Sequence, residues 1–204
     1  MRRFLAALLS IVLLLPTAAM AQMLLPGQAA QSKTEGLEIG TSTSEIAITS
    51  DFRGADLTIF GAVTNTDSLL LAIGQYDVVV VLEGPRENAT VRRKERVFGV
   101  WMNTRSMTFE AVPHSYSMSS SRGIEDLTTP LDLTDRGIGI DHIPLTPVGF
   151  VGDGSNLSEF RQAFLRLQQA GALYDRNTSG VRFVSSNLFK ASLRLPANIP
   201  NGVH

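Results

Sequence analysis

The sequence contains no cysteine among its 204 residues. This absence excludes disulfides, thiolate nucleophiles, zinc ribbons and iron–sulfur clusters. Histidine is scarce, and His114, His142 and His204 are too far apart to match a metal-ligand spacing. Neither charge is in excess, because 18 Lys and Arg residues stand against 19 Asp and Glu residues. A nucleic-acid-binding protein normally has a basic excess. We therefore expect no nucleic-acid partner, no metal and no cofactor.

Long apolar runs are absent beyond the N-terminus. Met1–Ala21 has two arginines, an apolar core and small residues before Ala21, which are the three parts of a secretory signal peptide. The core is shorter than the roughly 20 residues that a membrane span needs. We predict cleavage after Ala21, with an uncleaved N-terminal anchor as the alternative. The mature chain would then be periplasmic and would begin with a flexible leader at 22–36.

Period-2 patterns after the leader predict strands with one buried face, as in Ala55–Val63 and Phe189–Leu195. The recurrence of short strands and turns predicts a mainly β domain over 37–204, an immunoglobulin-like β-sandwich. Residues 123–148 are rich in Gly and Pro and read as a partly helical insertion.

One amphipathic helix is expected after Asn156, because apolar residues recur there at helical spacing. The alternative architecture is two small β-rich subdomains divided near Pro113, where strand patterning gives way to a serine-rich stretch that reads as a loop.

The stretch Tyr76–Asn103 is predicted to form a central β-hairpin around which the other segments pack. Val78–Leu82 and Val97–Met102 read as its core strands because both alternations are apolar, which would place Trp101 inside. A basic cluster lies between them: Arg92, Arg93, Lys94 and Arg96. Such runs usually lie on a solvated strand rim. The functional alternative is contact with anionic lipid headgroups or a partner subunit.

No catalytic motif is present. The serine-rich stretch His114–Arg122 lacks the G-x-S-x-G turn of a serine hydrolase. A hydrolase would need Asp77, Glu83, Glu110 or the histidines to converge, and nothing in their spacing predicts this. We therefore expect that the chain is not an enzyme.

Several stretches carry a resemblance to a known family: IAITSDF (46–52), GADLTIFGA (54–62), YDVVV (76–80), GP (84–85), VRRKER (91–96), GVWMN (99–103) and LFKA (188–191). With them, the chain resembles a family of putative transmembrane proteins of alphaproteobacteria whose function is uncharacterised. The resemblance extends over about 37–204.

This resemblance implies a β-domain on the secreted face, followed by a C-terminal membrane helix that holds it at the inner membrane. No apolar run of about 18 residues follows Ala21 here, so we expect the domain to be incomplete at its C-terminus. Family members lie near genes for sulfite-exporter-like transporters. The resemblance therefore implies an envelope or inner-membrane protein, such as a transporter, as partner.

Two functions fit these observations. The first is a non-enzymatic accessory or interaction domain in the periplasm, associated with the inner membrane. The second is a binding module for a small periplasmic anion or solute of the sulfur-oxyanion type. In the second, Arg92, Arg93, Lys94 and Arg96 would supply the charge and Trp101 an apolar wall.

Overall fold

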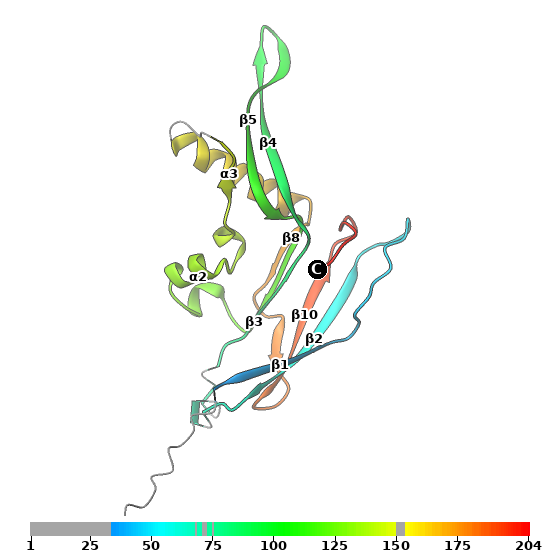
Figure 1. Cartoon of the computed structure of the whole chain (residues 1–204), viewed down its shortest axis with the longest axis vertical. Coiled ribbons are helices and arrows are strands. Elements are labelled where there is room, and N and C mark those ends of the chain that lie inside the picture. Colours follow the sequence, from blue (N-terminus) through cyan, green and yellow to red (C-terminus); the bar gives the residue numbers. More distant parts are fainter. Residues whose placement is uncertain (1–33, 68, 71–72, 75, 150–153) are drawn as a thin grey trace, which may run out of the picture. The chain divides into compact units, whose positions relative to one another are not determined.

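The computed structural model describes residues 34–67, 69–70, 73–74, 76–149 and 154–204. The predicted signal peptide and nearly all of the predicted leader lie outside the described residues. Thr34–His204 forms one compact unit. Its strands form three sheets (Figure 1), which confirms the predicted mainly β class.

The first sheet contains four strands, in the order β1 (Gly36–Thr41), β2 (Ala55–Thr64), β10 (Leu188–Leu195) and β9 (Val181–Phe183). Buried and exposed residues alternate along β10, because successive side chains of a strand point to opposite faces. Phe189, Ala191 and Leu193 are buried. The period-2 predictions for β2 and β10 are therefore confirmed.

The second sheet has the order β3 (Val79–Glu83), β6 (Tyr116–Ser120) and β8 (Tyr174–Asn177). β6 pairs antiparallel with β3 and parallel with β8, and all five of its residues are buried. The interpretation of this serine-rich stretch as a loop was wrong. Its serines are small enough to lie between two sheets, and the Ser119 hydroxyl donates a 2.9 Å hydrogen bond to the carbonyl of Ser192 in β10.

The second sheet is a middle layer with a core on each side. Val80 and Leu82 pack against the cluster formed by the first sheet, whereas Val79 and Val81 pack against a second cluster. The prediction that this strand is covered on both faces is confirmed.

Helical segments and the base of the third sheet cover the outer face of this middle layer. The helical segments are η1 (Ile124–Asp126), α2 (Pro130–Arg136), η2 (Ile140–His142) and α3 (Gly154–Ala170). Leu133 of α2 and Phe160 and Phe164 of α3 are buried in the second cluster, but Leu167 is exposed. Both the amphipathic helix and the partly helical insertion are confirmed.

The third sheet consists of β4 (Arg86–Val97), β5 (Val100–Pro113) and the short β7 (Thr146–Pro147). β4 and β5 form a long antiparallel hairpin. The predicted hairpin was wrong in its pairing, because Val79–Glu83 pairs with β6 and not with the strand that contains Trp101. The basic cluster is not a connection between two strands but part of a strand, β4.

Candidate functional site

The base of the β4–β5 hairpin belongs to the core. Val91 and Phe109 are buried, and the rings of Phe109 and Phe164 have centroids 5.9 Å apart. Two polar contacts also join the hairpin to α3. Arg93 Nη1 lies 3.0 Å from the Glu159 carboxylate, and Arg105 donates a 3.0 Å hydrogen bond to Asn156. Helix α3 therefore holds the base of the hairpin in place.

Beyond this base, the hairpin ends in a tip formed by residues 97–102 (Figure 1). Phe98 is 103% exposed, Val100 65%, Trp101 68% and Met102 49%. The prediction of a core strand at 97–102, with Trp101 inside, was wrong. Its apolar residues resemble core residues in sequence, but the tip lies past the elements that cover the base.

The turn at the tip has two residues, Phe98 and Gly99, with φ values of 49° and 84°. Two successive positive φ values are characteristic of type I′ turns, which favour Asn-Gly and suit the twist of a hairpin. A bulky residue at positive φ is uncommon. The fold therefore keeps an exposed aromatic ring at a backbone position that disfavours it.

All four residues of the basic cluster are exposed on β4, which confirms the prediction of a solvated strand rim. Arg93 also pairs with Glu95 at 2.9 Å, and Arg96 Nε donates to the Gly99 carbonyl at 3.1 Å. Among the residues that the structure describes, Arg92 and Lys94 form no ion pair.

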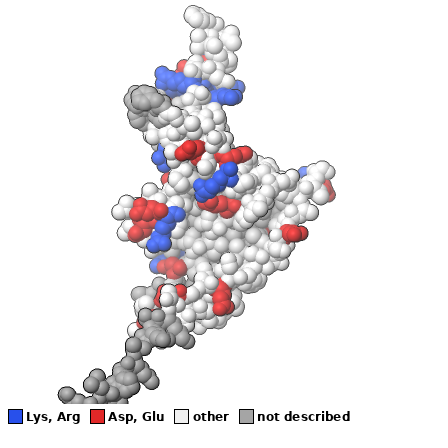
Figure 2. Space-filling view, viewed as in Figure 1, with Lys and Arg blue, Asp and Glu red and all other residues white. Residues whose placement is uncertain are grey.

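Arg105 is a fifth cation that the sequence reasoning missed. It lies opposite Arg93 in the ladder. A hairpin closed by the Phe98–Gly99 turn would have placed Arg105 next to the basic cluster, and this turn was the signal in the sequence that could have revealed it. Residues 91–109 contain five cations and one carboxylate, Glu95, in a chain whose formal net charge is −1. Figure 2 shows Lys and Arg side chains forming a band just behind the uncharged tip.

The cations do not converge on one point. Arg92 and Arg93 are neighbours on a strand, so their side chains leave opposite faces of the ribbon. Arg93 faces the Glu159 carboxylate of α3, which offsets its charge. This arrangement suits contact with an extended anionic surface better than chelation of one small ion.

A groove of about 260 Å³ between β4 and α3 is lined by Arg92, Arg93, Glu159, Phe160 and Arg166, among others. Trp101 is not among its lining residues. Trp101 instead lies opposite Arg96 in the ladder, at the hairpin tip, so an anion site with Trp101 as its apolar wall stays a prediction.

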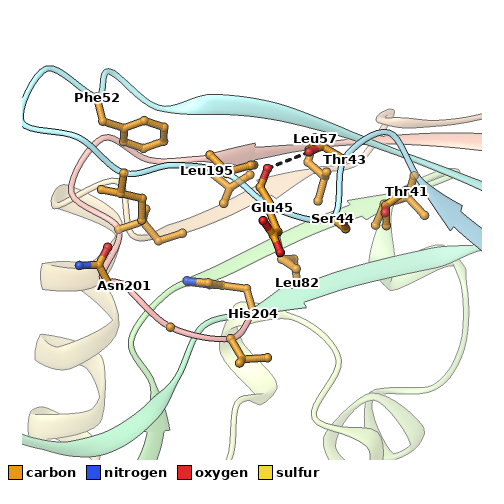
Figure 3. Close-up of a pocket in the computed structure, with 16 residues that line it drawn as sticks. Thr41, Thr43, Ser44, Glu45, Phe52, Leu57, Leu82, Leu195, Asn201 and His204 are labelled. Carbon is orange, nitrogen blue, oxygen red and sulfur yellow. Dashed lines mark hydrogen bonds between the residues drawn. The ribbon is translucent and has the colours of Figure 1, made fainter.

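A larger pocket of about 600 Å³ lies beside the first core (Figure 3). Phe52, Leu57 and Leu195 lie on one side, and Leu82 and His204 lie on the other. Glu45 and His204 are the titratable residues of its wall, which is otherwise largely apolar. The pocket can accept an apolar group. His204 in its wall has a buried Nδ1 with no hydrogen-bond partner among the described residues.

The family model described as "Putative transmembrane protein (Alph_Pro_TM)" matches residues 36–204. The chain belongs to this family. The resemblance predicted from the sequence is thus confirmed, and the hairpin, the groove and the pocket all lie within the matched range. No curated protein and no solved structure gives a significant match. Across the described ranges of this family member, no helix has the length and apolarity of a membrane span.

Four of the carboxylates and histidines considered for a hydrolase have separate partners. Asp77 accepts from Ser121 and pairs with Arg122, while Glu83 pairs with Arg86. His114 contacts Glu87, and His142 contacts Thr134. Within the part of this family member that the structure describes, no three His, Asp or Glu residues are grouped to hold a metal ion.

Two buried tyrosines lie in the core next to the hairpin base. Burial raises the pKa of Tyr116 and that of Tyr174. The Tyr116 hydroxyl accepts a hydrogen bond from the Gly139 amide, and the Tyr174 hydroxyl donates one to the Pro113 carbonyl. Both phenols are neutral at physiological pH and act as structural hydrogen-bonding groups.

Proposed function

We propose that this family member is a non-enzymatic accessory domain on the periplasmic side of the inner membrane. In this proposal, the β4–β5 hairpin is the surface through which the domain contacts another component of the envelope. The signal-peptide pattern of Met1–Ala21 and membership of a putative transmembrane family support this location.

The exposed hairpin tip is the observation that carries the proposal. Four apolar side chains are exposed at the tip, and the cations follow directly behind it. Scattered exposed apolar residues are ordinary, but a contiguous group bordered by polar residues marks a contact site. The base is anchored in the core, so the hairpin can present its tip without any rearrangement of the sheets.

The engagement of other polar groups supports a non-enzymatic role. The serines of β6 are buried. Ser119 and Ser120 of this strand, and Ser121 next to it, donate hydrogen bonds within the fold, whereas Ser117 Oγ has no hydrogen-bond partner among the described residues. A serine nucleophile needs an adjacent base and access to substrate. The three paired hydroxyls instead satisfy groups of the protein itself, and the Ser117 hydroxyl is buried.

Site-specific photo-crosslinking in the native host, with the full-length gene, tests this function. A photo-reactive residue at Trp101 should give adducts with envelope components. The same residue at Leu131 of α2, which is 70% exposed, is the matched control. An adduct pattern at Trp101 no different from that at Leu131 would refute the hairpin as the contact surface. Adducts with a transporter would identify the partner class that the resemblance implies.

A small-anion module is a second candidate, favoured by the groove between β4 and α3, whose wall includes Arg93 and Arg166. Arginine guanidinium groups bind oxyanions in fixed geometry. A ligand that binds only the folded state raises its unfolding temperature. Sulfite or sulfate should then stabilise the wild type but not Arg166→Ser, with chloride at equal ionic strength as control. Equal responses to all three anions would remove this candidate.

A further inference from the structure

Along the distal hairpin, apolar side chains lie at the outer end and cationic side chains lie behind them. Phe98 is outermost, and Val100, Trp101 and Met102 follow in β5. With about 3.3 Å per strand residue, Arg96 lies roughly 7 Å behind Phe98 and Lys94 roughly 13 Å behind it. The hairpin therefore has an apolar end and a cationic collar, here defined as Arg92, Lys94 and Arg96.

These dimensions match the outer part of a lipid bilayer. Interfacial segments bury their apolar face about 5–10 Å into the boundary between headgroups and acyl chains. Tryptophan is enriched at that level, and cations next to it are attracted to anionic headgroups. A tip at this depth would leave Arg96 at the level of the lipid phosphates.

We propose that the β4–β5 tip inserts into the interfacial region of an anionic bilayer, with the cationic collar at the headgroups. This inference rests on the proposed function and names the component that the hairpin contacts. It describes a peripheral contact made by a loop between strands, separate from any membrane-spanning segment.

The collar and Trp101 share one face of the hairpin. Arg92, Lys94 and Arg96 are two residues apart along β4, so their side chains leave the same face of the ribbon. Trp101 lies opposite Arg96 in the ladder and belongs to that face. An indole next to cations, directly behind an apolar turn, suits the headgroup level of an anionic bilayer.

The turn residue supports the same conclusion. Phe98 is fully exposed and has a positive φ of 49°, so the fold gains no buried ring contact from it. Asparagine suits this backbone conformation better. A residue that disfavours its backbone conformation and adds no stabilising contact within the fold is expected at a functional site. Burial of the Phe98 ring in lipid would supply a stabilising contact outside the fold.

The chain carries its own reporter for the test, because Trp101 is the single tryptophan. The mature protein is mixed with phosphatidylcholine vesicles, with or without about 30% of the anionic lipid phosphatidylglycerol, which gives the surface a negative potential. We expect a blue shift of Trp101 emission and flotation with the anionic vesicles. Brominated acyl chains should quench the emission, because the indole reaches the upper part of the chains.

Two variants separate the tip from the collar. Phe98→Asn keeps the turn and should weaken vesicle binding on the order of tenfold, since one aromatic side chain no longer leaves water. Replacing all three collar residues with serine should weaken binding to anionic vesicles on the order of a hundredfold at low salt. Leu131→Ser, an exposed apolar position on α2, should bind as the wild type does.

Unchanged Trp101 emission with anionic vesicles, together with no flotation, would overturn the inference. Equal loss of binding in Leu131→Ser would also overturn it, because the contact would not be specific to the tip. Photo-crosslinks from Trp101 to a protein, combined with failure to bind vesicles, would refute the lipid contact while leaving the proposed accessory function supported. Absence of both would refute the two proposals together.

Discussion

Trp101 lies directly opposite Arg96 in the β4–β5 ladder. Directly opposed residues of a hairpin share one face, so an exposed indole and a guanidinium lie side by side next to the turn. Arg96 Nε donates to the Gly99 carbonyl at 3.1 Å, which leaves the terminal nitrogens of the guanidinium available for an external anion. This pair joins the apolar tip to the basic cluster. Substitutions at the tip and in the cluster can therefore measure separately how much each contributes to the envelope contact.

Phe98→Asn should raise the free energy of unfolding. A left-handed conformation costs most residues about 1–2 kcal/mol, and asparagine tolerates it better. The replaced ring is fully exposed, so no core contact is lost. Urea unfolding of the two proteins should show a gain of up to about 1 kcal/mol.

Gly99→Ala is the companion variant for this prediction. Gly99 has a φ of 84°, and a Cβ added there would meet nothing within 4 Å, so the change tests backbone strain alone. We expect destabilisation. If Phe98→Asn were instead less stable than the wild type, the ring would have a structural role that its exposure does not show.

Replacing Arg92, Arg93, Lys94 and Arg96 with serine should leave the domain folded. Of these four, within the described part of the chain, only Arg93 makes ion pairs; its partners are Glu95 and Glu159, and both pairs are exposed. Exposed pairs contribute about 0–1 kcal/mol each. We expect a loss below about 2 kcal/mol in urea unfolding, for two such pairs, and loss of the envelope contact.

The control for this variant has four exposed cations outside the hairpin replaced with serine: Arg53, Arg182, Lys190 and Arg194. It carries the same charge change and should retain the envelope contact. Unfolding of the hairpin variant, but not of the control, would place the basic cluster in a stabilising network. Both proposed functions would then lose their main support.

Gly180→Ala should destabilise the contact between the first two sheets. A Cβ at Gly180 would lie 1.9 Å from Ser119 Oγ, whose hydroxyl already donates to the Ser192 carbonyl. Overpacking of this kind typically costs about 1–3 kcal/mol. Gly40→Ala is the matched control, because a Cβ there meets nothing within 4 Å. Equal unfolding free energies for the two variants would contradict the close approach of the sheets.

The sequence predicted those strands whose two faces differ. β10 alternates between apolar and polar residues because one face lies on the core, and this difference between the faces is visible in the sequence. The exposure of the basic cluster was predictable for a similar reason, since four cations cannot be buried without partners. The family resemblance was likewise readable from the chain.

The sequence could not reveal what covers each face of a strand. β6 reads as a polar loop, yet it is fully buried because Ser117 and Ser119 occupy the narrow space next to the first sheet. The hairpin tip reads as core, yet it is exposed because none of the described helices and strands packs over it. Both errors concern tertiary neighbours, which local patterns do not specify.

Tyr174→Phe should make stability less sensitive to alkaline pH. Burial raises the pKa of Tyr174 from its ordinary value of 10.0, so the folded state retains a proton that the unfolded chain loses. The stabilising contribution is complete below pH 10 and declines as the pH rises above it. At pH 7 the variant should be about 1 kcal/mol less stable, because the 2.7 Å hydrogen bond to the Pro113 carbonyl is lost. Near pH 11 the wild type should lose about 1.4 kcal/mol per such tyrosine, so the difference should vanish or reverse. Urea unfolding at pH 7, 9 and 11 measures this difference in unfolding free energy. If the unfolding free energies of the two proteins declined in parallel with rising pH, burial of Tyr174 would not account for the loss, which would contradict the prediction.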